Sequence, residues 1–111
     1  MGKVIVINNE KMGQGENDLT TLLMGNFLRA LVSSENKPEF IIFYGSGVKL
    51  ISEGSAYLEI VATLENLGTE ILSCSTCLNY YGLADKVKVG RKSNMKEIVE
   101  IFLKSKETIT I

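Results

Sequence analysis

The stretch Thr69-Glu-Ile-Leu-Ser-Cys-Ser-Thr-Cys-Leu-Asn79 joins a short apolar run to the only two cysteines of the chain, Cys74 and Cys77. Residues Thr69–Ser73 have the composition of a buried strand, and a short helix is predicted over Cys77–Tyr81. A cysteine at such a junction lies beneath the unpaired amides of the helix start, which stabilise a thiolate and lower the thiol pKa. The stretch therefore predicts a site for sulfur chemistry. Core packing is the alternative, because free cysteine is often buried as a small apolar residue.

Strands and helices alternate along the rest of the chain. The predicted strands are Lys3–Asn8, Glu39–Tyr44, Thr69–Ser73, Lys86–Val89 and Glu107–Ile111, and the predicted helices are Asp18–Val32, Ser55–Leu67, Cys77–Tyr81 and Met95–Leu103. The segment Val48–Ser52 fits an extended piece as well as a helical turn. This alternation predicts an α/β fold with three α/β/α layers and a mostly parallel five-stranded sheet, because right-handed crossovers place helices on both faces.

The helix ends carry their own signals. Asn17 or Asp18 is expected to cap the first long helix, and Ser55 the second. Asn94 with Glu97 resembles the capping box of the last helix.

Length and composition restrict the possible functions. A chain of 111 residues forms one domain, residues 1–111, that folds without a disulfide or metal. A net charge of −1 gives no electrostatic reason to expect a nucleic-acid partner. No apolar stretch approaches the roughly 20 residues of a membrane span, and the first residues lack a signal-peptide cleavage region, so we expect a cytoplasmic protein with no membrane partner. In a reducing compartment a CxxC pair indicates redox, sulfur-transfer or metal chemistry.

The chain contains no histidine. This excludes Ser-His-Asp and Cys-His catalytic units and an imidazole metal ligand. Two thiolates are too few for a structural zinc site, which needs four ligands, so a metal would require a second subunit. We expect no cofactor.

Three loops follow the predicted strands and are expected to meet at one edge of the sheet, where ligands bind in such folds. They are Asn9–Asn17, Gly45–Gly47 and Cys74–Cys77. Glycine in the first loop lets backbone amides approach an anion such as a persulfide, although a flexible turn explains it equally well. The predicted anion-binding residues are Met12, Gly13, Gly15, Ser46, Gly47, Ser75, Thr76 and Asn79, with Ser46 offering its hydroxyl to the crevice.

Two further groups of residues have more than one reading. Lys86, Lys88, Arg91 and Lys92 form a basic cluster, which fits a solvated sheet edge better than a docking site for an acidic protein. Tyr80 and Tyr81 are candidates for lining the cysteine pocket or a subunit contact, and ordinary core packing explains one of them equally well.

A resemblance to a known family covers essentially the whole chain. The matching segments are Lys3-Val-Ile-Val-Ile-Asn8, Met12-Gly-x-Gly15, Ile41-Ile-Phe-Tyr-x-Ser-Gly-Val-Lys-Leu50, Glu53-Gly-Ser55, Glu70-Ile-Leu-Ser-Cys-x-Thr-Cys-Leu-Asn-x-Tyr-Gly82 and Ser93-Asn-Met95. Together they resemble the DsrE-like domain of YedF-type proteins, which are sulfurtransferase-like and associated with selenium metabolism.

The resemblance implies a DsrE/DsrF-like fold with flavodoxin-like layering, an oligomeric assembly and a cysteine that carries sulfur as a persulfide. Cys74 matches the position of that carrier, and Cys77 matches a second cysteine found in part of the family. YedF-type proteins also carry a TusA-like sulfur-carrier domain ahead of this one, so the resemblance implies a TusA-like protein or domain as partner.

The sequence therefore predicts a sulfur-relay protein in which Cys74 takes sulfane sulfur from a donor and passes it on by thiol exchange. Cys77 is then available to resolve the persulfide as a disulfide. The alternative is a non-catalytic module that binds a small anion or a partner and senses redox state through its CxxC pair. A thioredoxin-like oxidoreductase fits less well, because the pair lacks Trp-Cys-Gly-Pro surroundings and follows the third strand.

Overall fold

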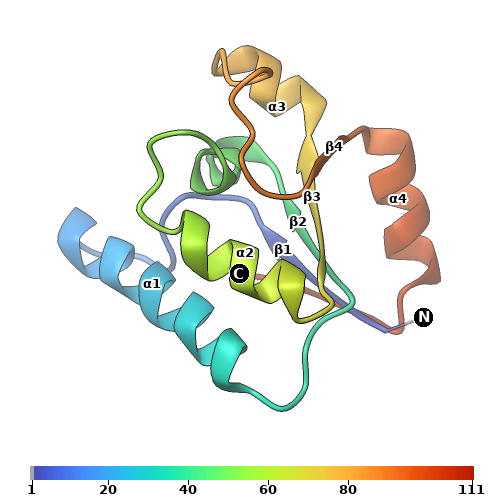
Figure 1. Ribbon diagram of the computed structural model, residues 1–111, viewed down its shortest axis with the longest axis horizontal. Helices are drawn as coiled ribbons and strands as arrows, with labels where there is room; N and C mark the ends of the chain where they lie inside the picture. Colours follow the sequence, from blue (N-terminus) through green and yellow to red (C-terminus); the bar gives the residue numbers. More distant parts are fainter. Residues whose placement is uncertain (1) are drawn as a thin grey trace.

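Five strands and five helical segments alternate in the computed structural model, which describes residues 2–111 (Figure 1). The strands are β1 (Lys3–Ile7), β2 (Phe40–Phe43), β3 (Glu70–Cys74), β4 (Arg91–Ser93) and β5 (Glu107–Thr110). The helices are α1 (Asn17–Ser33), the 3-10 helix η1 (Gly45–Ile51), α2 (Leu58–Asn66), α3 (Ser75–Tyr80) and α4 (Met95–Lys104). All strands run parallel in the order β4-β3-β2-β1-β5, so the predicted α/β fold with a five-stranded parallel sheet is confirmed.

The two faces of the sheet bury different side chains. Residues that alternate along β1 and β2, such as Ile5 and Ile41, face the larger core cluster, which includes side chains of α1 and α2. Their neighbours, such as Val4 and Ile42, face a smaller cluster closed by Ile98 and other residues of α4. Figure 1 shows α1 and α2 on one side of the sheet and α4 on the other. This two-sided burial explains why the strands are apolar at successive positions.

The fourth strand differs from the prediction. Lys86–Val89 does not join the parallel sheet, and Arg91–Ser93 does. Val87 instead forms an isolated antiparallel bridge with Ser52. Between the two segments lies Gly90, with a φ of +75°, where a β-carbon would lie 2.4 Å from a carbonyl oxygen of β3. Val87 is thus used in a local pairing, Val89 is buried in the larger core cluster, and the glycine lets the chain approach β3 before the strand begins.

Two predicted helix caps are also wrong. Helix α1 has Glu16, rather than Asn17 or Asp18, at its N-cap position, and Glu16 makes no side-chain capping hydrogen bond. Ser55 Oγ accepts the amide of Tyr57 at 3.0 Å, but α2 begins only after Tyr57. Ser55 therefore stabilises the turn ahead of the helix instead of the helix itself.

The segment after β2 forms η1, which settles the ambiguous Val48–Ser52 in favour of a helical turn. It brings Val48, Leu50 and Ile51 into the larger core cluster. No helix within residues 2–111 combines the length and the apolar character needed to cross a membrane.

Candidate functional site

Cys74 ends β3 and occupies the N-cap position of α3. Its side chain is 2% exposed and lies in the smaller core cluster with Val4, Ile42 and Ile98. Its thiol makes no capping hydrogen bond to the helix amides, contrary to the expectation from the junction. The burial of Cys74 follows from the alternation of β3, which turns Leu72 and Cys74 toward α4.

Cys77 lies one helical turn later and is half-buried between the two core clusters. Its Sγ atom accepts a hydrogen bond from the amide of Gly45 at 3.0 Å. Burial raises the pKa of the Cys77 thiol above 9.0, the Gly45 amide partly offsets this, and a hydrogen bond and the charge of Cys74 raise it further. For Cys77, desolvation thus outweighs the single amide donor.

The loop after β2 is shaped by close backbone contacts. A β-carbon at Gly47 would lie 2.3 Å from the carbonyl oxygen of Ile7, and Gly45 has a φ of +57°. Only glycine fits these positions, and the close approach sets the amide of Gly45 against the sulfur of Cys77. The hydroxyl of Ser46 accepts the amide of Glu10 at 3.1 Å, so it connects the first two loops.

The glycine loop after β1 is directed toward α1. The amide of Met12 donates to the carbonyl of Thr20 at 3.0 Å, and Met12 packs against the larger core cluster. A β-carbon at Gly13 would meet only Leu23 within 4 Å. Gly15 similarly faces Leu19. The structure thus brings Gly45, Ser46, Cys74 and Cys77 together, and it places Gly13 and Gly15 on the start of α1.

The remaining predicted residues lie on α3. Ser75 Oγ donates to the carbonyl of Ser93 at 2.6 Å, which joins the start of α3 to β4. Thr76 and Asn79 are exposed to solvent. Of these three side chains, only that of Ser75 is held by a contact within the site.

A network of charged and hydroxyl groups supports this junction, and the sequence pattern did not predict it. Arg91 Nη2 donates to Glu70 Oε2 at 2.8 Å and to Glu97 Oε2 at 2.7 Å. Ser93 donates its hydroxyl to the carboxylate of Glu97, while its carbonyl accepts from Ser75. The Arg91 guanidinium and the Ser93 hydroxyl lower the pKa of Glu97 to about 2.

The sequence contained part of the information needed to predict this network. The capping box at the start of α4 is half confirmed, because Asn94 Oδ1 accepts the amide of Glu97 at 2.9 Å. The Glu97 side chain reaches Arg91 instead of returning the bond. In the basic cluster, Arg91 pairs with carboxylates, Lys88 lies 3.8 Å from Glu53, and Lys92 donates to a backbone carbonyl. The paired charges agree with the reading of this edge as solvated.

An open cavity of about 560 Å³ lies at the same edge of the sheet. It is bordered by Glu10 and Lys11 after β1, Thr21 of α1, the segments 49–50 and 52–57, and Tyr81 and Leu83 after α3. Neither cysteine lines it. The sulfur atoms and this cavity are therefore two separate features of one edge.

Within residues 2–111 no group of three or more cysteine, aspartate or glutamate side chains is arranged to hold a metal ion. The chemistry available at the site is that of two thiols, backbone amides and hydroxyl groups.

The sequence matches no protein-family model, and no curated protein matches it. The solved structures that are similar to this chain include three that match it over nearly its whole length. A protein of unknown function, MTH1491 from Methanobacterium thermoautotrophicum, is 19% identical with a TM-score of 0.67, covering 96% of this chain and 97% of that one. The ychN protein from E. coli is 17% identical with a TM-score of 0.69 and complete coverage of both chains.

A conserved protein of unknown function, BT1422 from Bacteroides thetaiotaomicron, is 16% identical with a TM-score of 0.67, covering 98% of this chain and 94% of that one. At these identities the likeness concerns the fold. The chain is thus similar in architecture, along its whole length, to three compact α/β proteins.

Proposed function

We propose that the protein is a sulfur-relay protein that carries sulfane sulfur as a persulfide on Cys74. The position of Cys74 is the observation that carries the proposal. Cys74 ends β3 at the N-cap position of α3, one helical turn before Cys77, whose Sγ atom accepts the amide of Gly45. Burial and the neighbouring Cys74 raise the pKa of Cys77, so Cys77 is a protonated thiol at neutral pH that can donate a hydrogen bond to sulfur held on Cys74.

The burial of Cys74 supports the same role. Its side chain is 2% exposed and lies among apolar residues. A persulfide attached there is shielded from water, which slows its loss before an acceptor engages the site. The DsrE-like resemblance supports Cys74 as the carrier, since Cys74 matches the family's carrier position.

The transfer needs no cofactor. The Cys74 thiolate attacks the outer sulfur of a donor persulfide, a new S–S bond forms to Cys74, and the donor's S–S bond breaks to release the donor thiolate. An acceptor thiolate then attacks the outer sulfur on Cys74, which breaks that S–S bond and returns Cys74 to its thiolate form. Two exchanges move one sulfur atom without net oxidation.

Cys77 provides a second route by which sulfur can leave the Cys74 persulfide. If its thiolate attacks the inner sulfur of the Cys74 persulfide, a disulfide forms between Cys74 and Cys77 and sulfide leaves. The two thiols are then oxidised, the sulfane sulfur is reduced, and a dithiol reductant is needed to restore the pair. The raised pKa of Cys77 slows this reaction at neutral pH, because the thiolate is the nucleophile.

We also propose the setting in which the relay works. The protein acts as a homo-oligomer in the cytoplasm, exchanges sulfur with a TusA-like carrier protein or domain, and has a link to selenium metabolism. Exposed apolar side chains, including Leu22 at 55%, Tyr80 at 83% and Leu103 at 81%, support contacts between subunits.

A transfer experiment tests the proposal. The protein is loaded with radiolabelled sulfur from a small-molecule persulfide, separated from the donor, and mixed with a purified TusA-like carrier. Label should pass to the carrier from the wild type and from Cys77→Ser, and not from Cys74→Ser. Equal transfer from both variants would contradict the assignment of Cys74.

A further inference from the structure

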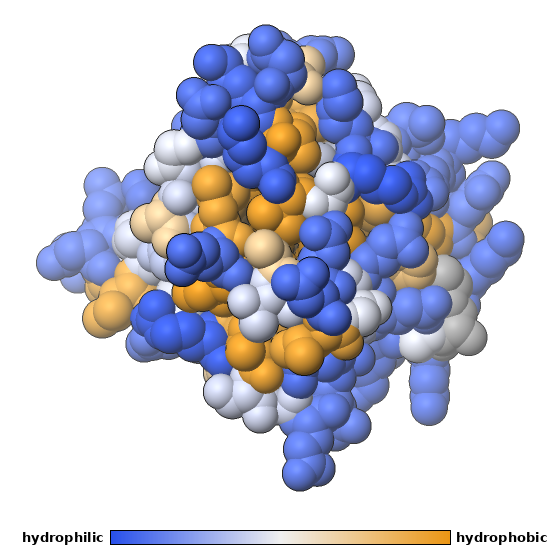
Figure 2. All heavy atoms as spheres, in the orientation of Figure 1, coloured by the Kyte–Doolittle hydropathy of each residue, from blue (hydrophilic) through white to orange (hydrophobic). Residues whose placement is uncertain are grey.

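The open cavity beside the cysteine site has the size and lining of a ligand site. Its volume of about 560 Å³ lies within the roughly 300–1,000 Å³ typical of small-molecule sites. Figure 2 shows apolar side chains gathered in the middle of the face that lies between α3 and α2. The cavity is formed by segments that follow β1, β2 and α3, which are far apart in sequence.

One of the positive charges that line the cavity has no carboxylate partner within residues 2–111. Lys49 lies 3.7 Å from Glu10, and Glu53 is matched by Lys88, which lies 3.8 Å away and outside the lining. Lys11 Nζ donates to the neutral side-chain oxygen of Asn17 at 3.1 Å, and it forms no ion pair within residues 2–111. The cavity lining thus holds two ammonium groups and two carboxylates, and Lys11 is the one of these four that has no ion-pair partner within residues 2–111, which favours a ligand with a single negative charge.

The ammonium group of Lys49 is held in place by its neighbours. It lies 4.6 Å from the centre of the Tyr81 ring, in a cation–π contact. The Tyr81 ring in turn packs edge-on against Tyr80, with centroids 5.1 Å apart. The pair with Glu10 is long and exposed, so it is weak and can yield to an entering anion.

Backbone donors add to this positive character. Gly54 and Ala56 lie on the cavity wall, and their amides donate no hydrogen bond within residues 2–111. Free amides beside ammonium groups are the donors that a carboxylate accepts.

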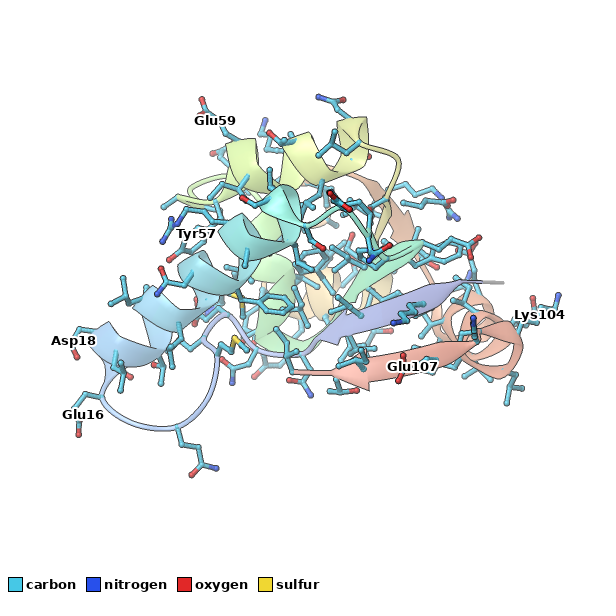
Figure 3. The ribbon with its side chains drawn as sticks, turned by 90° about the horizontal axis from the view of Figure 1, so that it is seen from below. Glu16, Asp18, Tyr57, Glu59, Lys104 and Glu107 are labelled. Carbon is cyan, nitrogen blue, oxygen red and sulfur yellow. The ribbon has the colours of Figure 1, made fainter. Side chains whose placement is uncertain are left out.

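Aromatic and aliphatic groups form the rest of the wall. The Tyr57 hydroxyl donates to the carbonyl of Thr21 at 3.0 Å, which fixes its ring between α2 and α1 (Figure 3). Leu50 and Leu83 supply aliphatic surface. These groups suit the apolar body of a ligand rather than an inorganic anion.

We propose that this cavity binds a small organic monoanion, a carboxylate with an apolar, ring-sized body. Lys11 and Lys49 take up the charge, the amides of Gly54 and Ala56 donate to the carboxylate, and the tyrosine rings contact the apolar body. The proposal is independent of sulfur relay, because neither cysteine lines the cavity.

Titration of the ¹⁵N-labelled protein with phenylacetate tests this site by NMR. The amides of Gly54 and Ala56 should shift with a dissociation constant of about 1 mM. Benzyl alcohol, which keeps the ring and lacks the charge, should bind at least about fivefold more weakly. The double variant Cys74→Ser/Cys77→Ser should bind phenylacetate as the wild type does, so this experiment remains valid if the protein carries no sulfur.

Variants that each remove one lysine charge test where the carboxylate of phenylacetate binds. Lys49→Gln and Lys11→Gln should each weaken phenylacetate binding about five- to tenfold. Lys104→Gln removes the same charge from α4, far from Tyr57 in Figure 3, and should leave the affinity within about twofold. Absence of shifts at Gly54 and Ala56 in about 20 mM phenylacetate, equal affinity of Lys49→Gln and Lys104→Gln, or benzyl alcohol binding as tightly as phenylacetate would each overturn the proposal.

Discussion

The amide of Gly45 donates a hydrogen bond to the Sγ atom of Cys77 across 3.0 Å, which ties the loop after β2 to the helix after β3. This bond favours the thiolate form of Cys77, but burial has the larger and opposite effect on the pKa. Cys77 is therefore a protonated thiol at neutral pH beside the more deeply buried Cys74. This difference between the two thiols underlies the division of roles proposed for them.

The first prediction concerns the ionisation of Cys77. In Cys74→Ser the remaining thiol should still titrate above 9.0, because burial is the largest cause of the shift and persists. The shift should be smaller than in the wild type, because the contributions of Cys74 are lost. Ultraviolet absorbance of the thiolate during a pH titration measures both values. A thiol that titrates below 9.0 in the folded variant would be inconsistent with the observed burial.

The same shift predicts how stability depends on pH. The folded state prefers the protonated Cys77, so its contribution to stability is complete below the unfolded pKa and is lost as pH rises through the higher folded pKa. The reduced wild type should lose stability above about pH 9, and Cys77→Ser should lose less over that range. Urea unfolding at several alkaline pH values provides the comparison.

A second prediction tests the close approach at Gly47. In Gly47→Ala the new β-carbon would lie 2.3 Å from the carbonyl oxygen of Ile7, so the loop must move away from β1. We expect a loss of about 3 kcal/mol in the free energy of unfolding. Gly54→Ala is the matched control, since its β-carbon meets nothing within 4 Å and only its positive φ is strained. It should lose about 1 kcal/mol. Equal losses would show that the loop has room at Gly47.

The positions of the strands along the chain were easier to predict from the sequence than the contacts within the site. Two-sided burial makes β1, β2 and β3 continuously apolar, so these strands were found within one or two residues. The edge strand β4 contains Arg91, Lys92 and Ser93, and it carries no such apolar signal. Its pairing is fixed by the space at Gly90 and by the ion pairs of Arg91, which depend on tertiary contacts.

The sequence predicted which loops meet at the site, but not the environment of the thiols. The strand ends place Gly45 and Cys77 at one edge, as the rule for parallel sheets predicts. The thiol pKa depends on how deeply each sulfur is buried, and the spacing of the two cysteines gives no measure of that depth. The glycine loop was likewise predicted to approach an anion, but Gly13 and Gly15 lie against Leu23 and Leu19 of α1, and the sequence pattern gave no indication of these contacts.

A third prediction concerns the network around Glu97. Its pKa of about 2 means that the folded state prefers the carboxylate, so the stabilisation is present above the unfolded pKa near 4.5 and disappears as pH falls toward 2. Glu97→Gln should lower stability at neutral pH by about 1 kcal/mol, a modest value because the Arg91 pair is partly exposed to solvent. Its stability should also vary less between pH 4.5 and 2 than that of the wild type.

Thermal unfolding across that pH range measures the effect. Lys3→Gln provides a comparison, because it removes a single exposed contact of 3.6 Å to Glu107 at the other edge of the sheet. Lys3→Gln should change the free energy of unfolding by less than about 0.5 kcal/mol. The variation of its stability between pH 4.5 and 2 should be the same as in the wild type. If the two variants behave alike, the Arg91 network contributes no more than an ordinary surface pair.

A fourth prediction concerns assembly. Light scattering at micromolar concentration should report a particle of more than one chain. Replacing an exposed apolar residue by a charge, as in Leu22→Glu or Tyr80→Glu, should shift the particle toward a single chain, because burying an unpaired charge in a subunit contact is costly. The matched change Glu100→Lys alters a residue that is already charged and exposed, and it should leave the mass unchanged. A wild type that stays a single chain would contradict the proposed assembly.

The most direct test of the sulfur relay is the intact mass of the protein after incubation with a small-molecule persulfide donor. The account predicts that the wild type and Cys77→Ser each gain the mass of one sulfur atom, that a reducing thiol removes it, and that Cys74→Ser gains none. Equal gains by Cys74→Ser and Cys77→Ser, or a gain by Cys74→Ser alone, would contradict the assignment of the persulfide to Cys74.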